Sequence, residues 1–188
     1  EFRRVLFRSS RAGVGDGLIF LSPQGDAQAD PSHPVAPGPL IVDGQGRPVW
    51  FSPLASGTGV LATDFRVQTY QGRPVLTWMQ GGDQTVVRTT TTTDYILDDS
   101  YTVIARVQAG NGLNANRHDF QITPQNTALL VIYNLIPCDL SPVGGTVSGK
   151  VYEAVIQEVE IATGAVLMEW HSLADVPLTD SYLDRKST

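Results

Sequence analysis

The chain has 188 residues, of which 41% are hydrophobic, and a formal net charge of −6 at pH 7. This acidic balance argues against nucleic acid as a partner, because phosphate backbones are bound by basic surfaces. No apolar run is long enough to span a bilayer. Cys138 is the only cysteine, which excludes an internal disulfide and a cysteine-based zinc site.

The two ends of the chain differ in character from the rest. Residues 1–9 and 184–188 look like translated sequencing adapter, in the two orientations expected at the ends of one read. The apolar stretch at 5–7 is too short for a signal-peptide core of about 7–15 residues. We therefore exclude both ends from fold reasoning and expect residues 10–183 to form one partial domain.

Short apolar segments separated by turn residues fill the remaining sequence, as is typical of an all-β protein. The strongest turn signal is Asp-Gly-Gln-Gly at 43–46. We predict a short buried strand at 17–21, hairpins at 39–52, 64–79, 95–108, 116–133 and 152–170, and loops at 22–39, 80–93, 135–150 and 171–182.

An internal repeat organises these segments. Asp64-Phe65 and Asp119-Phe120 are 55 residues apart, and each pair opens a hairpin. Asp43 and Asp98 have the same spacing, and each lies between two short apolar strands. A third, more widely spaced copy of the outer hairpin lies at 157–170. A period near 50 residues with about four strands is the signature of β-propeller blades, so we predict about three four-stranded antiparallel blades, with the 171–182 loop leading toward another.

Several blocks resemble the arylsulfotransferase (ASST-like) family, and its fungal and actinobacterial branch most closely. The main block is Asn116-Arg117-His118-Asp119-Phe120-Gln121-Ile122-Thr123, followed by Thr127-Ala128-Leu129-Leu130. The others lie at 38–51, at 155–164 and at 169–173. The resemblance extends over nearly all of residues 17–182.

The resemblance implies a β-propeller, commonly six-bladed, that is extracellular or periplasmic. It implies transfer of a sulfuryl group from an aryl sulfate to a phenol through a sulfo-histidine, without a nucleotide sulfate donor or any other cofactor. The partners it implies are small aryl sulfates and phenols, and the missing blades of the full-length chain. It further implies that Asn116, Arg117, Asp119 and Asp175 occupy positions near the substrate.

The sequence departs from the family pattern at three of these positions. The family usually has an acidic residue where Asn116 stands and glutamate where Asp119 stands. Relatives often have a second histidine where this chain has Asp175. These departures favour an alternative, a non-catalytic propeller that binds a small molecule, a glycan or a protein, because a propeller fold alone does not choose between the two functions.

His118 is the first candidate for the reacting group. Sulfuryl transfer needs an unprotonated imidazole nitrogen, donors for the sulfate oxygens and an acid for the leaving phenolate. The upstream repeat has Thr63 at the equivalent position, so the blade pattern itself does not demand a histidine. In the alternative, His118 shares a strand face with Phe120 and Ile122 and is a core histidine.

Other residues receive two interpretations as well. His171 follows the last predicted strand and is a second catalytic candidate. Arg66, Arg88 and Arg106 are candidate sulfate clamps or solvated surface residues. Trp50, Trp78 and Trp170 are most simply packing residues between blades. We predict no metal site, since Glu158 and Glu160 on one strand face lack a third ligand.

Overall fold

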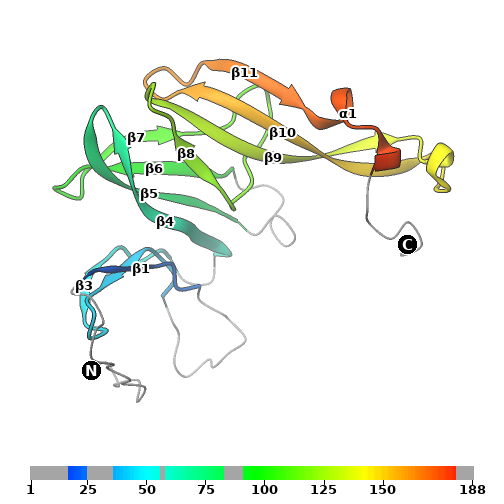
Figure 1. Cartoon of the computed structure of the whole chain (residues 1–188). Coiled ribbons are helices and arrows are strands. Elements are labelled where there is room, and N and C mark those ends of the chain that lie inside the picture. Colours follow the sequence, from blue (N-terminus) through cyan, green and yellow to red (C-terminus); the bar gives the residue numbers. More distant parts are fainter. Residues whose placement is uncertain (1–16, 25–35, 56–57, 83–90, 181–188) are drawn as a thin grey trace, which may run out of the picture.

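The computed structural model describes residues 17–24, 36–55, 58–82 and 91–180. The two terminal segments interpreted as adapter, and Arg88, lie outside these ranges. The described chain is all β, with almost no helix, and forms three antiparallel sheets of three or four strands (Figure 1). The predicted propeller-like architecture is confirmed at this level, although the sheets do not close into a ring.

Each sheet is a run of strands in which chain neighbours pair side by side. The first sheet contains β1 (Ile19–Leu21), β2 (Leu40–Val42) and β3 (Pro48–Phe51). The second contains β4 (Val60–Tyr70), β5 (Arg73–Gly82), β6 (Thr93–Leu97) and β7 (Val103–Val107). The third contains β8 (Phe120–Ile122), β9 (Thr127–Cys138), β10 (Gly149–Glu160) and β11 (Val166–His171). Three short helical turns are η1 (Ser141–Val143), α1 (Ser172–Asp175) and η2 (Leu178–Asp180).

The first strand of each sheet lies at the inner edge of the stack. Strand β4 contacts both β1 and β8, so these three strands are neighbours although they belong to different sheets. The strand order then places β7 and β11 at the outer edges of their sheets. This is the arrangement of propeller blades, in which the first strands face a common axis.

Aromatic side chains fill the space between the first and second sheets. Trp50 stacks on Tyr101 and Trp78 stacks on Tyr95, each with ring centroids 5.1 Å apart. Phe65 packs against both tryptophans at 5.8 and 6.3 Å. Trp50 and Trp78 are therefore packing residues between sheets, as the sequence predicted.

Aliphatic residues and one phenylalanine fill the space between the second and third sheets. Met79, Ile96, Phe120 and Leu130 are each at most 1% exposed and belong to one cluster. Phe120 and Phe65, equivalent in the 55-residue repeat, pack in successive inter-sheet cores. The repeat read from the sequence therefore corresponds to a repeated packing position. Burying a side chain of this size stabilises the fold by about 1.5–3 kcal/mol.

The hairpin turns repeat a hydrogen-bond pattern. Oδ1 of Asp43 and Oδ1 of Asp98 each accept from the backbone amides two and four residues later, at 2.9–3.0 Å. In the third sheet, Oγ1 of Thr123 accepts from the amides two and four residues later, at 3.2 and 3.3 Å. The turn at 123–127 also uses Asn126, whose φ of 63° is tolerated better by asparagine than by most residues. The predicted turns are confirmed.

Four sequence predictions about the elements are wrong in detail. Strand β1 is not buried, because Ile19 is 46% exposed and Leu21 is 42% exposed. The loop predicted at 135–150 is strand at both ends, since β9 continues to Cys138 and β10 begins at Gly149. The strand predicted from Asn116 begins only at Phe120. The segment after β11 forms α1 and η2, and its described part contains no new strand.

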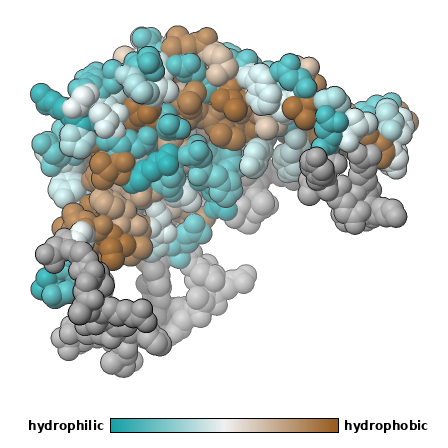
Figure 2. All heavy atoms as spheres, in the orientation of Figure 1, coloured by the Kyte–Doolittle hydropathy of each residue, from teal (hydrophilic) through white to brown (hydrophobic). Residues whose placement is uncertain are grey.

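Exposed apolar residues mark the outermost faces of the stack. Figure 2 shows hydrophobic residues gathered over the first sheet, where Ile19, Leu21, Val49 and Phe51 are exposed. On the third sheet, the long β9–β10 hairpin exposes Tyr133, Leu135 and Tyr152. In the described ranges, no helix has the length and apolar character needed to cross a membrane.

Candidate active site

His118 lies in a turn that immediately precedes β8, at the inner edge of the third sheet. Its side chain is exposed, and no hydrogen bond or ion pair of His118 occurs within the described part of the chain. The prediction of a core histidine is therefore wrong. The physical reason is that the strand begins two residues later, so His118 does not share the buried face of Phe120 and Ile122. The imidazole is therefore exposed rather than packed in the core.

Side chains of β4 hold the segment on either side of His118. We call Thr63, Asp64, Arg66 and Gln68 the β4 clamp. Oγ1 of Thr63 donates to the carbonyl of Arg117 at 2.5 Å, directly before the histidine. Oδ2 of Asp64 accepts from the amide of Phe120 at 3.1 Å, just after it. The position of the His118 backbone is thus set by the neighbouring sheet.

The geometry of β4 explains how the clamp reaches β8. The pairing of β4 with β5 shifts register between Thr63 and Arg66, and Asp64 within this bulge has a φ of 53°. A bulge redirects side chains out of the regular alternation. Here it allows Asp64 and Arg66 to reach the third sheet.

Gln68 extends the clamp along the edge of β8. Its Nε2 donates to the carbonyl of Phe120 at 2.9 Å, and its Oε1 accepts from the amide of Ile122 at 2.8 Å. The side-chain amide therefore pairs with the free edge of β8 as a neighbouring strand would. Phe120 and Ile122 are at most 8% exposed, so these backbone groups need partners inside the protein.

Arg66 is the cation of the clamp. Its Nη2 lies 2.8 Å from Oδ1 of Asp119 and 3.1 Å from Oδ2 of Asp64, and it also donates to the carbonyl of Phe120. Burial raises the pKa of Asp64, against the lowering effects of the Phe120 amide and Arg66. The Arg66 side chain is 40% exposed, so the guanidinium remains partly open to solvent.

The other predicted residues of this segment lie at different depths. The Asp119 side chain is 59% exposed, whereas Asn116 is only 8% exposed and its Oδ1 is buried without a hydrogen-bond partner. Arg117 is partly buried. The structure therefore brings Asp119 and Arg66 to the solvent side of the site, and Asn116 to its interior side.

His171 lies apart from this site. It ends β11, the outer strand of the third sheet, three strand spacings or about 14 Å from the inner edge. Its Nδ1 is 3.0 Å from Oε2 of Glu153, and its Nε2 is 2.9 Å from Oε1 of Glu169. These two carboxylates, Glu153 first, raise the pKa of His171. An imidazolium that donates from both nitrogens has no free nucleophilic nitrogen, so the geometry favours a structural role.

Asp175 also lies away from His118. Its Oδ2 accepts a hydrogen bond of 2.5 Å from Nε1 of Trp170 in β11, the outer strand. Trp170 is half-buried on this outer strand and is not part of the two inter-sheet cores, unlike the prediction made for it. Arg106, a candidate clamp, lies over the Tyr95 ring at 5.4 Å and belongs to the outer strand β7.

An open groove of about 800 Å³ lies beside the site, between β4 and the β8–β9 hairpin. It contains Arg66 and Asp119, and its remaining walls are mainly amides and hydroxyls from Gln68, Thr69, Gln121, Thr123 and Asn126. Sequence reasoning named Arg66 as a candidate, but it missed the polar character of this wall. The repeated Thr and Gln residues after Phe65 and Phe120 were the available signal.

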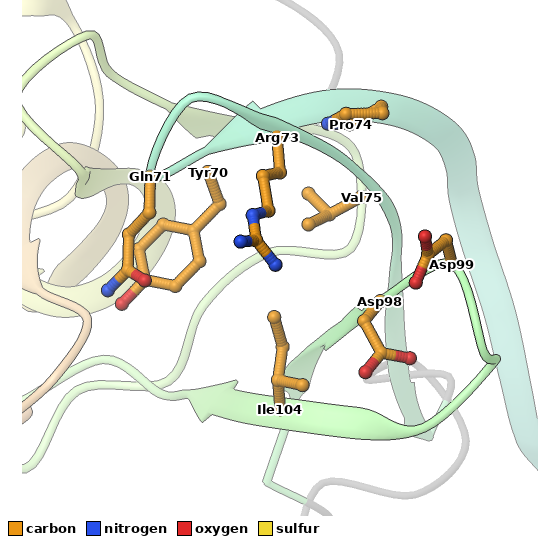
Figure 3. A pocket seen from close by; sticks show the side chains of 8 residues that line it. All are labelled: Tyr70, Gln71, Arg73, Pro74, Val75, Asp98, Asp99 and Ile104. Atoms are coloured by element: carbon orange, nitrogen blue, oxygen red, sulfur yellow. The ribbon is translucent and has the colours of Figure 1, made fainter.

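A second cavity of about 600 Å³ lies at the opposite end of the second sheet (Figure 3). Arg73 points into it between Tyr70 and Ile104, and Asp98 and Asp99 lie across from these residues. Tyr70 lies six residues along β4 from Asp64, a rise of about 20 Å, so this cavity is far from the end of β4 that holds the His118 segment. The groove at Arg66 is the one lined by Asp119, the residue that follows His118.

Comparison with known proteins gives one match. Residues 68–185 match the family model described as Arylsulfotransferase (ASST), a range that includes the His118 segment and most of the second and third sheets. No curated protein and no solved structure matches the chain. The resemblance seen in the sequence blocks is confirmed at the level of the family, and the branch within it stays a prediction.

Proposed function

We propose that this chain, which belongs to the arylsulfotransferase (ASST) family, moves a sulfuryl group from an aryl sulfate to a phenol at His118. The observation that carries the proposal is the exposed His118 side chain on a backbone fixed from two sides by the β4 clamp. A fixed backbone limits the orientations that the nucleophile samples, which favours a productive approach.

In the first proposed step, a neutral nitrogen of His118 attacks the sulfur of the aryl sulfate. The bond between sulfur and the aryl oxygen breaks, and the phenolate leaves with its electron pair and takes up a proton. In the second step, the acceptor phenol loses its proton as its oxygen attacks the sulfur. The sulfur–nitrogen bond breaks, and the electron pair returns to the imidazole. No nucleotide donor takes part.

Arg66 is the proposed donor to the sulfate oxygens, since it is the cation of the groove and bonds to Asp119, the residue after His118. Its existing partners Asp64 and Asp119 hold the guanidinium in place before substrate arrives. Asp119, exposed next to His118, is a candidate partner for the imidazole. The acceptor would lie along the amide- and hydroxyl-lined groove. An extracellular or periplasmic location is part of the same proposal.

The test is a transfer assay on the full chain with a chromogenic aryl sulfate and a phenol. His118→Ala should lower turnover by at least about 100-fold, and His171→Gln is the matched control because that histidine lies on the outer strand. Mass spectrometry after donor addition should show a sulfuryl group on the peptide that contains His118. Turnover that survives His118→Ala would remove this histidine from the mechanism.

A non-catalytic binding module is the second candidate function. The observation in its favour is that Asp175 stands where relatives often have a second histidine, and it bonds to Trp170 away from the groove. Aryl sulfate binding without sulfuryl transfer or labelling would support this alternative over the enzyme.

A further inference from the structure

Arg73 places an uncompensated guanidinium in the cavity at the far end of the second sheet. The cavity has a volume of about 600 Å³, and Arg73 points into it between Tyr70 and Ile104 (Figure 3). Within the described ranges, Arg73 makes no hydrogen bond or ion pair. Tyr70 and Val75 supply a buried apolar floor, at 9% and 4% exposed. Pockets of about 300–1,000 Å³ with a few polar groups on apolar walls are typical of small-molecule sites.

Two carboxylates line the same cavity from the turn that follows β6. Leu97 at the end of β6 pairs with Leu76 of β5, so Asp98 begins the turn one residue beyond this pair. Arg73 is three residues from Leu76 along β5, a rise of about 10 Å. Arg73 forms no ion pair with Asp98 or Asp99, which lie across the cavity from it. The cavity therefore holds separated charges of both signs.

The internal repeat shows what the second oxygen of Asp98 is able to bind. Asp43 and Asp98 use Oδ1 for the same turn bonds, but Oδ2 of Asp43 also accepts from Nε of Arg47 at 2.6 Å. Thr102 occupies the position equivalent to Arg47, and within the described residues Oδ2 of Asp98 accepts no hydrogen bond. Bonds from Ser100 and Thr102 lower the pKa of Asp98, so its carboxylate is ionised at neutral pH. Asp98 is thus a turn aspartate that lacks the cation found in the equivalent turn.

We propose that this cavity binds a small zwitterion, with its carboxylate on Arg73 and its guanidinium or ammonium group on Asp98. Pairs between a guanidinium and a carboxylate form short, charge-assisted hydrogen bonds and are often bidentate. The carbon chain between the two charges would lie against Val75 and Ile104.

The lining disfavours ligands that carry a single charge. An anion on Arg73 would lie near Asp98 and Asp99, and a cation on Asp98 would lie near the Arg73 guanidinium. Like charges placed together in a site exclude the wrong ligand, so only a molecule with both charges meets attraction at both ends. Binding does not depend on sulfuryl transfer, because the cavity is far from the end of β4 that holds the His118 segment.

The experiment is isothermal titration calorimetry of the full chain with three probes. γ-Guanidinobutyrate carries both charged groups, butyrate lacks the guanidinium, and butylguanidine lacks the carboxylate. We expect saturable binding of γ-guanidinobutyrate to one site, with at least about threefold weaker binding of the other two. Raising sodium chloride from about 0.05 to about 0.5 M should weaken the binding, because Arg73 and Asp99 are exposed and salt screens such pairs.

Two variants test the two ends of the site. Arg73→Gln and Asp98→Asn should each weaken binding of γ-guanidinobutyrate by about two- to fivefold, as expected for partly exposed ion pairs. Asp98→Asn keeps an oxygen for the turn amides, and Arg73→Gln keeps the test valid if Asp98→Asn does not fold. Asp43→Asn is the matched control, since it changes the equivalent turn of the first sheet and should leave binding unchanged.

Three results would overturn the proposal. The first is the absence of saturable heat with γ-guanidinobutyrate. The second is equal affinity for butyrate or butylguanidine, which would show that one charge suffices. The third is unchanged affinity in both Arg73→Gln and Asp98→Asn, which would place the binding elsewhere on the protein.

Discussion

Gln68 offers the sharpest test of how the third sheet is attached. Gln68→Ala removes the side-chain oxygen that accepts from the Ile122 amide, and it also removes bonds to Thr77 and to the carbonyl of Phe120. Phe120 keeps a bond from Arg66, so its carbonyl is not left unpaired. Leaving the buried Ile122 amide without a partner lowers the free energy of unfolding by about 1–3 kcal/mol, and the lost bond to the Thr77 hydroxyl lowers it by about 1 kcal/mol more. We expect a total loss of about 2–4 kcal/mol in the free energy of unfolding.

The assay is equilibrium unfolding in urea, with thermal unfolding as a second measurement. For a chain of this size, the expected loss corresponds to a drop of about 5–10 °C in the midpoint. Gln121→Ala is the matched control, because Gln121 is exposed on the same edge strand β8 and its side chain makes no hydrogen bond within the described residues. If Gln68→Ala is no more destabilising than Gln121→Ala, the side-chain pairing with β8 contributes nothing and the reasoning is refuted.

Two further predictions concern the outer strand and the core. The pKa of His171 is raised in the folded protein, so protonated His171 stabilises the fold below about pH 6.5, and this stabilisation is lost as the pH rises through the folded pKa. The pKa of Glu169 is lowered to about 2, mainly by its bond with His171, so ionised Glu169 stabilises the fold fully above about pH 4.5. The stability difference between the unchanged protein and His171→Gln should therefore peak between about pH 4.5 and 6.5, and a flat difference in unfolding curves across pH would contradict this. Phe120→Ala should lower the free energy of unfolding in urea by about 3–5 kcal/mol, because the Phe120 ring is 1% exposed. Ile104→Ala should lower it far less, because Ile104 is 46% exposed. Equal losses in the two variants would show that the inter-sheet core does not dominate the stability.

The local parts of the fold could be predicted from the sequence. Turns at Asp43 and Asp98 depend on a side chain that bonds to amides two and four residues later, so the residue type and the spacing carry the information. The paired positions of Phe65 and Phe120 were visible because each blade repeats one packing position. These features depend on short sequence separations or on a repeat.

The length of the β9–β10 hairpin could not be predicted in the same way. Glycine and proline between 135 and 150 indicated a loop, yet Pro137 pairs with Lys150 and Cys138 pairs with Gly149. Pairing of two long strands can carry residues with low strand propensity, because the neighbouring pairs fix the register. The propensity signal was therefore outweighed by partners on the opposite strand.

The location of His118 depends on contacts that alternation along one strand does not reveal. The pattern from Asn116 to Ile122 fits a strand. However, Arg117 and the Phe120 amide bond to Thr63 and Asp64, more than 50 residues upstream. The position of His171 was also not predictable from the sequence pattern. It lies in a block that resembles the family, but only the strand order shows that β11 is at the outer edge and that its imidazole is held by Glu153 and Glu169.

The candidate site therefore belongs to the junction of two sheets rather than to either sheet alone. The third sheet supplies His118 and Asp119, while the second supplies the β4 clamp that fixes their backbone and the guanidinium beside them. The outer part of the same junction is apolar, with Met79 and Leu130 buried in it. The apolar core between the second and third sheets holds them together. The polar contacts of the β4 clamp at the inner edge set the position of His118. A change in the packing of the two sheets would then move His118 relative to Arg66, even with both side chains intact.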